Sequence, residues 1–365
     1  MKITFPHMGN VYLAVKALFD GLGSEYVIPP FNSKTALEIG SLHSPEEICL
    51  PFKLMIGNYI QAIEKGADTI IITGSCGPCR FGEYCEMQMM LLKQLGHPLD
   101  FIVIDAPKDI GIKELLNRIG KVAKSGGRPA AQRWRALAYA VRVMRLMDEI
   151  EARAHTLAGH EKNTGECKMI LNACRRDAFQ CSAPKEMLRV LNDYKQQING
   201  IEIDPQKTPL KIAIIGEIYT IIEPFSNLYI EEKLMDYGVS TRRKLTPSWW
   251  VGNMVMTPTK LHALDIKKAS KKYLPFYIGG HAKECIGETV MAIEGGMDGA
   301  IQIFPMGCMP EIVAKSILPG ISKDHDFPIL SLIVDEMTGE AGYVTRIEAF
   351  IDLLERRKIN GVSRC

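Results

Sequence analysis

The fold of this chain is decided by residues 62–79, which read AIEKGADTIIITGSCGPC. The stretch begins at the end of an amphipathic helix, where Gly66 is a typical helix stop. It continues through an apolar, β-branched run at residues 68–73, typical of a buried strand in a parallel sheet. It then enters a Gly/Pro loop that contains two cysteines. A helix, a buried strand and a loop in this order predict a βαβ unit.

The same alternation extends to both sides of this stretch. Toward the N-terminus we expect strands at residues 2–8 and 25–28 and helices at residues 11–21 and 51–65. Toward the C-terminus we expect helices at residues 81–95 and 110–123 and a strand at residues 100–105. Strands separated by helices of this length predict a parallel sheet.

The pattern changes in the middle of the chain and then restarts. Helical spacing predominates at residues 133–157 and 184–194, and residues 207–210 resemble a linker. From residue 211 we expect strands at 211–216, 299–304 and 328–334, with helices at 227–237, 281–294 and 344–354. The predicted fold is α/β, with two Rossmann-like parallel-sheet domains and a helical insert between them. Its parts are an N-terminal α/β domain at residues 1–127, a helical segment and linker at 128–207, and a C-terminal α/β domain at 208–365.

A short repeat suggests that the two α/β domains arose by duplication. Residues 62–68 read AIEKGAD and residues 292–298 read AIEGGMD. Each stands at a helix end, directly before an apolar strand. Each strand then enters a Gly/Pro loop with a cysteine, Cys76 in one case and Cys308 in the other.

Composition and charge limit the function classes. The 365 residues are 47% hydrophobic and 24% charged, with a formal net charge of +2. This charge gives no electrostatic case for nucleic acid or for an acidic membrane surface. No apolar run approaches the roughly 20 residues that cross a bilayer. The N-terminus lacks the features of a signal peptide, so we expect a cytoplasmic protein.

Ten cysteines in such a chain require an explanation, because clustered cysteines in a reducing compartment more often bind metal or do redox chemistry. Four are expected to be small buried apolar residues, namely Cys167, Cys174, Cys181 and Cys365. The other six are the predicted metal ligands, namely Cys49, Cys76, Cys79, Cys85, Cys285 and Cys308. We expect one iron–sulfur site with cysteines from both α/β domains.

The positions of these cysteines suit such a site. Ligands of parallel sheets bind at the carboxyl ends of the strands, where Cys76 and Cys308 are expected. Cys49 directly precedes a helix, whose N-terminus lowers a thiol pKa. Three glycines are expected to let the backbone approach a bulky cluster, namely Gly74, Gly77 and Gly307. His281 is the candidate for a proton donor beside the cluster.

Two other interpretations of the cysteines stay open. Structural zinc favours two short Cys pairs, whereas the sequence contains one C-x2-C pair. Thiol–disulfide exchange is suggested by Cys76-Gly-Pro-Cys79, the core of the thioredoxin motif. Against it stand the third cysteine, Cys85, and the length of the chain.

Several motifs together resemble the 2-hydroxyacyl-CoA dehydratase superfamily, in the branch of proteins related to the activases of CoA-substrate-specific enzymes. The motifs are EEICLPFK at residues 46–53, GSCGPCRFGEYC at 74–85, FPMGCMPE at 304–311, DEMTGEAG at 335–342 and TRIEAF at 345–350. Within this branch the chain is most similar to double-cubane cluster proteins, which are homodimers. The resemblance implies a double-cubane [8Fe-9S] cluster, for which about six thiolates are needed.

The resemblance also implies a division of labour. A separate iron–sulfur activator would hydrolyse ATP and deliver a low-potential electron, and this chain would reduce a small substrate. The sequence agrees in having no GxxxxGK[ST] phosphate loop of its own. Two alternatives remain, a dehydratase-like subunit with a [4Fe-4S] cluster that acts on CoA thioesters, and a non-catalytic cluster carrier.

Overall fold

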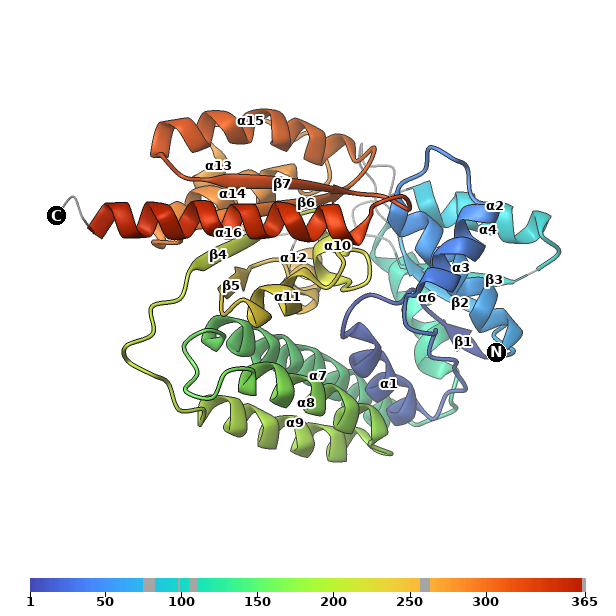
Figure 1. Ribbon diagram of the computed structural model, residues 1–365. Helices are drawn as coiled ribbons and strands as arrows, with labels where there is room; N and C mark the ends of the chain where they lie inside the picture. The colour runs from blue at the N-terminus through green and yellow to red at the C-terminus, as the bar shows by residue number, and fades with distance from the viewer. Residues whose placement is uncertain (75–82, 98, 105–109, 257–262, 363–365) are drawn as a thin grey trace. The chain divides into compact units, whose positions relative to one another are not determined.

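The computed structural model describes residues 1–74, 83–97, 99–104, 110–256 and 263–362 (Figure 1). It confirms the α/β class, because two parallel sheets stand among many helices. The chain divides into two compact units. Unit 1 contains Met1–Glu149, Ala173–Lys195 and Trp250–His262; unit 2 contains Ile150–Asn172, Gln196–Trp249 and Ala263–Cys365.

Unit 1 is built on a three-stranded parallel sheet of order β1-β2-β3. The strands are β1 (Ile3–Thr4), β2 (Thr69–Thr73) and β3 (Asp100–Ile104). Tyr26 makes an isolated parallel bridge to Ile3, on the side of β1 away from β2. The helices before the long helical region are α1 (Val11–Leu22), α2 (Lys34–His43), α3 (Leu50–Glu64), α4 (Tyr84–Gln94) and α6 (Ile112–Lys124).

Two glycines let α2 and α3 cross in close contact. A Cβ at Gly40 would lie 1.7 Å from the carbonyl oxygen of Lys53, and a Cβ at Gly57 would lie 1.8 Å from that of Ala36. Any larger residue would force the helices apart. This crossing holds α3 in place, and α3 positions the first predicted ligand.

Unit 2 is built on a four-stranded parallel sheet of order β5-β4-β6-β7. The strands are β4 (Lys211–Gly216), β5 (Ser240–Arg243), β6 (Gly299–Pro305) and β7 (Ile329–Val334). The helices of this part of the chain are α10 (Ile218–Ile222), α11 (Ile230–Asp236), α12 (Pro247–Met256), α13 (Leu264–Ser270), α14 (Ala282–Glu294), α15 (Met309–His325) and α16 (Glu340–Val362).

Helices cover both faces of the sheet of unit 2 (Figure 1). On one face, α14 and α15 share a core with the sheet, which includes Ile215 and Ala300, and α13 packs on α14. On the other face, α16 packs over β6, where a Cβ at Gly299 would lie 3.0 Å from the Phe350 ring. Helix α11 joins the same face through the ion pair between Lys233 and Glu340. The sheet is therefore doubly wound, as a Rossmann-like domain requires.

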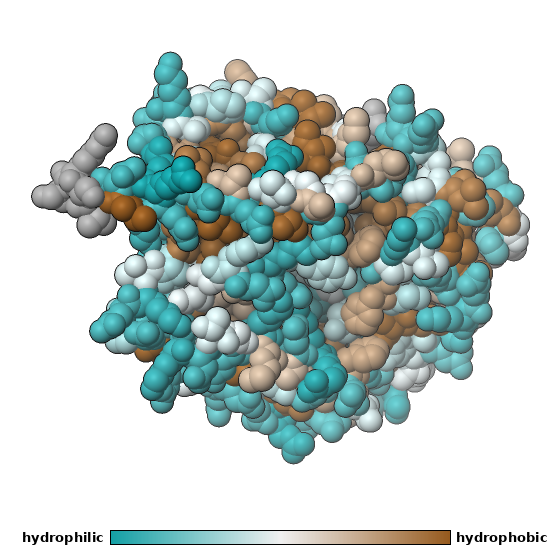
Figure 2. Space-filling model, viewed as in Figure 1, coloured by the Kyte–Doolittle hydropathy of each residue, from teal (hydrophilic) through white to brown (hydrophobic). Residues whose placement is uncertain are grey.

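The predicted helical insert consists of α7 (Ala130–Leu157), α8 (Glu166–Gln180) and α9 (Pro184–Asn199). Its residues divide between the two units, since each helix has one portion in either unit. The predicted linker at residues 207–210 forms neither helix nor strand. No helix within the described ranges has the length and apolarity needed to cross a membrane. The face in Figure 2 is mostly hydrophilic, with apolar residues in separate groups.

Equivalent hydrogen bonds support the predicted duplication. The N–H of Lys2 donates to the carboxylate of Asp68 at 2.7 Å, and the N–H of Lys211 donates to that of Asp298 at 2.7 Å. In return, each Asp donates its own N–H to the carbonyl of the same Lys. The two units also share one strand order when the Tyr26 bridge is matched with β5.

Most predicted elements agree with the structure within a few residues, with two corrections near the N-terminus. The strand expected at residues 2–8 is limited to Ile3–Thr4, and that expected at 25–28 is reduced to the Tyr26 bridge. Both lie where prolines remove the N–H donors that a ladder needs, Pro6 in the first case and Pro29 with Pro30 in the second. The helices α2, α8, α10, α12, α13 and α15 and the strand β5 are additional to the prediction.

Candidate functional site

Cys49 is the N-cap residue of α3, with Pro51 in the first turn. Proline suits this position because the first N–H groups of a helix have no partner inside it. The Cys49 side chain is partly buried, and its Sγ makes a hydrogen-bond contact with the hydroxyl of Tyr84. The thiol therefore lies at the positive end of a helix and beside a phenol donor, both of which favour the thiolate.

Cys85 is buried in the first turn of α4, next to Tyr84. Helix α4 packs on α3 through two side-chain contacts. The rings of Phe52 and Tyr84 meet edge-on at 5.0 Å, and Nε2 of Gln88 lies 3.5 Å from Sδ of Met55. The packing of these two helices brings the Tyr84–Cys85 pair to the beginning of α3.

Tyr59 lies farther along α3 and is fully buried. Among the residues that the structure describes, its hydroxyl has no hydrogen-bond partner. Burial raises the pKa of Tyr59 above its usual range, and the negative charge of a Cys85 thiolate raises it further. A buried hydroxyl without a partner costs about 1–3 kcal/mol, so an acceptor within its reach would be stabilising.

Lys53 is a buried cation in the same part of unit 1. Only 2% of this residue is exposed, and its ammonium donates to the carbonyl of Glu46 at 3.0 Å. A buried ammonium is costly unless negative charge lies nearby. One turn of helix separates Lys53 from Cys49. Its position suits a residue that balances the negative charge of thiolates.

The loop after β2 contains the rest of the predicted site in unit 1. Gly74 is buried, and its N–H donates to the carbonyl of Ile104 at 3.1 Å. Cys76, Gly77 and Cys79 lie outside the described residues. The predictions for them are unchanged.

Unit 2 has a topological switch point, the position in a doubly wound sheet where ligands typically bind. The chain leaves β4 toward β5 on one side, and β6 and β7 lie on the other side. The loops after β4 and β6 therefore diverge at this point. Gly216 permits the close approach of the two strands, because a Cβ there would lie 1.9 Å from the carbonyl oxygen of Ile303. Its φ of +135° is also one that favours glycine.

Cys308 follows β6 at this switch point, as the N-cap of α15. It follows Gly307, whose φ of +78° lies in the left-handed region, and it precedes Pro310 in the first turn. Cys308 is 9% exposed. Cys49 and Cys308 thus share one local arrangement, a cysteine N-cap followed by a first-turn proline. The sequence signal is C-x-P in both cases.

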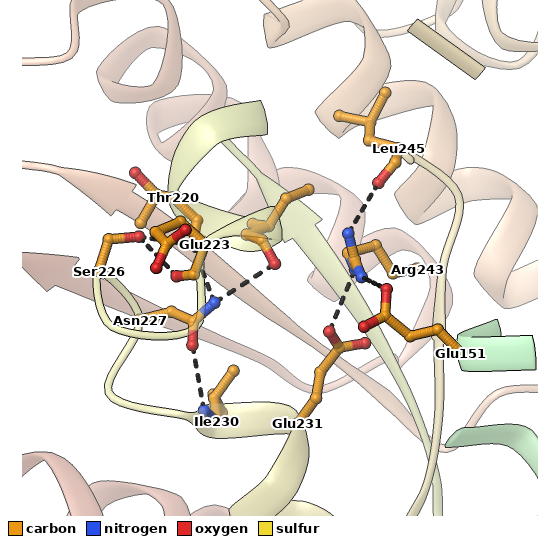
Figure 3. Close-up of polar contacts among 10 residues, drawn as sticks. Glu151, Thr220, Glu223, Ser226, Asn227, Ile230, Glu231, Arg243 and Leu245 are labelled. Atoms are coloured by element: carbon orange, nitrogen blue, oxygen red, sulfur yellow. Dashed lines mark hydrogen bonds and ion pairs between the residues drawn. The ribbon is translucent and has the colours of Figure 1, made fainter. Parts of the chain in front are cut away.

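The loop after β4 is fixed by polar contacts at the same edge (Figure 3). Asn227 donates from Nδ2 to the carbonyl of Thr220 at 2.9 Å and accepts the N–H of Ile230 at 3.2 Å. The Glu217 carboxylate accepts the N–H and the hydroxyl of Thr220 at 2.8 and 2.7 Å. These contacts tie the loop after β4 to itself and to the start of α11.

Cys285 lies in a different environment, fully buried on α14 within the apolar core of unit 2. Burial raises the pKa of its thiol well above the usual range, and the carboxylate of Glu311 raises it further. Metal binding requires the thiolate, so this environment opposes ligation by Cys285. Its role as a ligand stays a prediction.

Three carboxyl groups surround Cys285 on α14 and α15. Glu311 is fully buried and accepts Nε2 of Gln302 at 3.0 Å. Among the described residues, both carboxyl oxygens of Glu288 and one oxygen of Glu284 are buried without a hydrogen-bond partner. Burial raises the pKa of all three carboxyls, that of Glu311 to about 7. Burial therefore favours the protonated form of each carboxyl.

His281, the candidate proton donor, is the N-cap of α14 and makes no side-chain cap hydrogen bond. Its carbonyl accepts the N–H of Cys285 at 2.8 Å. Burial lowers the pKa of the His281 ring to about 4. The ring is neutral at pH 7, which makes it a weak acid there, and its catalytic role stays a prediction.

Within the described ranges, no group of three or more His, Cys, Asp or Glu side chains could hold a metal ion. Cys76 and Cys79 fall outside those ranges. The chemistry of the donors in unit 1 nevertheless fits an iron–sulfur cluster. Two thiols lie at the beginnings of packed helices, and the buried hydroxyl of Tyr59 has no partner in the chain.

The sequence prediction missed several residues of this site. Tyr59 and Tyr84 resemble ordinary core aromatics, and only their proximity to cysteines in the fold distinguishes them. From the sequence, Lys53 could equally balance the charge of a cluster or be a solvated surface residue, and the structure shows that it is buried. Glu288 and Glu311 lie on helices among apolar neighbours, a pattern that could have indicated buried carboxyls.

The chain was compared with protein-family models and with curated proteins, and neither comparison gives a match. The resemblance to the dehydratase superfamily therefore stays a prediction that depends on the quoted motifs.

Proposed function

We propose that this chain is an iron–sulfur redox protein whose cluster binds through Cys49, Cys76, Cys79 and Cys85. One observation is the main support. Cys49 and Cys85 stand at the beginnings of two packed helices, and the Tyr84 hydroxyl contacts Sγ of Cys49. Cys285 and Cys308 remain predicted ligands from the second half of the chain.

The residues of unit 1 have distinct roles in this proposal. The N-terminus of α3 and the hydroxyl of Tyr84 stabilise the Cys49 thiolate. The ammonium of Lys53 supplies positive charge within the same helical turn. The contact of α3 with α4 buries Cys85. When bound, such a cluster supplies a low-potential one-electron carrier.

The proposed partners follow from the resemblance. An ATP-hydrolysing iron–sulfur activator delivers the electron, and the chain, as a homodimer, passes it to a small-molecule substrate. The absence of a phosphate-loop motif in the sequence agrees with ATP hydrolysis on a separate protein.

The deciding experiment is anaerobic purification followed by measurement of iron, acid-labile sulfide and the visible spectrum. We expect broad absorbance near 400 nm with about eight irons per chain for a double cubane, or about four for a single cubane. Zinc without visible absorbance would contradict the proposal. A reversible disulfide in iron-free protein would favour thiol–disulfide exchange instead.

Alanine variants then identify the ligands. We expect C49A and C85A to lose most of the bound iron. C167A is the matched control, because Cys167 is a fully buried free cysteine of the helical region. It should retain the iron content of the wild type. Iron content in C308A and C285A shows whether the second half of the chain contributes; full retention in both would restrict the site to the first half.

A further inference from the structure

Two tyrosine hydroxyls lie at the predicted ligands of unit 1, and neither belongs to the ligand set. Tyr84 is 1% exposed, and its hydroxyl contacts Sγ of Cys49. Tyr59 is fully buried, and its hydroxyl has no hydrogen-bond partner. Both rings are fixed by the packing of α3 on α4, since Tyr84 is held edge-on by Phe52.

The direction of the Tyr59 side chain follows from helix geometry. Side chains on an α-helix lean toward its N-terminus, so the Tyr59 ring leans back toward the preceding turn of α3, which carries Met55. Met55 contacts Gln88, one turn after Cys85 on α4, so the ring leans toward the first turns of α4. Burial raises the pKa of Tyr59, and a Cys85 thiolate raises it further. The unused donor thus lies near sulfur.

A buried phenol has one O–H donor to offer. Sulfur of a thiolate or sulfide accepts such a bond, and each added donor stabilises the extra negative charge of a reduced cluster. Donors at cluster sulfurs therefore raise the reduction potential. Apolar side chains in the same positions would leave it lower.

We propose that Tyr84 and Tyr59 are positioning residues that donate hydrogen bonds to cluster sulfurs, Tyr84 to Sγ of Cys49 and Tyr59 to sulfur at Cys85. Together they set the reduction potential at which the protein accepts its electron. This inference rests on the proposed function, because it requires a cluster at these cysteines.

The test compares the full-length, cluster-loaded wild type with Tyr84→Phe and Tyr59→Phe. An anaerobic redox titration, monitored by electron paramagnetic resonance, measures the midpoint potential of each. Each variant should shift the midpoint potential to a more negative value and keep the iron content of the wild type. Tyr343→Phe is the matched control, since Tyr343 is a buried tyrosine of unit 2 whose hydroxyl also has no partner. The midpoint potential of Tyr343→Phe should equal that of the wild type.

A second measurement does not require the cluster and therefore also applies to variants that bind little iron. In iron-free protein, the rate of Cys49 alkylation at fixed pH, followed by mass spectrometry, reports its thiolate fraction. We expect Tyr84→Phe to slow alkylation several-fold, because the thiolate loses its donor. Unchanged potentials in both loaded variants, or an unchanged alkylation rate in Tyr84→Phe, would overturn the inference. A wild-type protein without iron would instead refute the proposed function.

Discussion

At the scale of the residue, the unusual groups of unit 2 are its buried carboxyls. Glu311 is fully buried and accepts a hydrogen bond from Nε2 of Gln302 at 3.0 Å. Gln302 in turn accepts the hydroxyl of Ser331 at 2.8 Å. The thiol of Cys285 lies beside the same carboxyl. Such a carboxyl is tolerated when it is neutral, because ionisation in this environment is costly.

The protonation of Glu311 predicts a pH dependence of stability. Burial raises its pKa from 4.5 to about 7 in the folded protein, so the folded state binds this proton more tightly. The resulting stabilisation is complete below pH 4.5 and is lost as the pH rises toward 7. Its size is about 3 kcal/mol, from 1.36 kcal/mol per pKa unit.

Glu311→Gln removes this dependence, and urea unfolding of the iron-free protein between pH 4.5 and 8 measures it. The stability of the wild type relative to the variant should fall across that interval. Glu202→Gln is the control at an exposed carboxylate, and its stability relative to the wild type should stay level. A parallel pH dependence of the wild type and Glu311→Gln would show that Glu311 titrates normally.

At the scale of the element, the sequence predicted the apolar strands and the amphipathic helices. It missed elements that bury cysteine or charged side chains in place of the usual aliphatic ones. Helix α8 buries Cys167, Leu171, Cys174 and Ala178, and the buried Cys181 directly follows it. Cysteines occupy the apolar positions, as expected of small buried residues, but they hid the helical pattern. Strand β5 has the sequence STRR, which has no apolar strand pattern. Its buried arginine is stabilised by partners that are distant in the sequence, so the strand could not be predicted from local residues.

That arginine, Arg243, joins three elements of unit 2 (Figure 3). Its side chain is 5% exposed and makes ion pairs with Glu151 of α7 at 2.9 Å and Glu231 of α11 at 3.1 Å. It also donates to the carbonyl of Leu245 at 3.2 Å. The candidate site likewise depends on tertiary contacts. The cysteines could be predicted as ligands from the sequence, but the roles of Tyr59 and Tyr84 could not.

Arg243→Met is expected to lower the free energy of unfolding by about 3–5 kcal/mol, because it leaves two carboxylates buried without a cation. Thermal and urea unfolding measure the loss. Lys168→Met removes an exposed ion pair with Asp236 and should cost at most about 1 kcal/mol. The triple variant Glu151→Gln, Glu231→Gln, Arg243→Met should regain part of the loss. Equal stability of Arg243→Met and Lys168→Met would contradict the assignment.

At the scale of the whole molecule, duplication explains why two units with little sequence in common share a strand order and a cysteine N-cap. The feature that both units share is the junction between a helix and the strand that follows it, α3 to β2 in unit 1 and α14 to β6 in unit 2. At both junctions a glycine with positive φ ends the helix, Gly66 at +88° and Gly296 at +66°. An aspartate then accepts the N–H of the residue that begins the first strand.

The two junctions should therefore respond alike to one mutation. Asp68→Ala and Asp298→Ala each remove a 2.7 Å hydrogen bond to a backbone N–H, of Lys2 in one unit and of Lys211 in the other. Each is expected to cost about 1 kcal/mol in urea unfolding. Because the two aspartates share no partners, the double variant should lose the sum of the single losses. A large cost in one unit with none in the other would show that the junctions are not equivalent, and the argument for duplication would then depend on strand order alone.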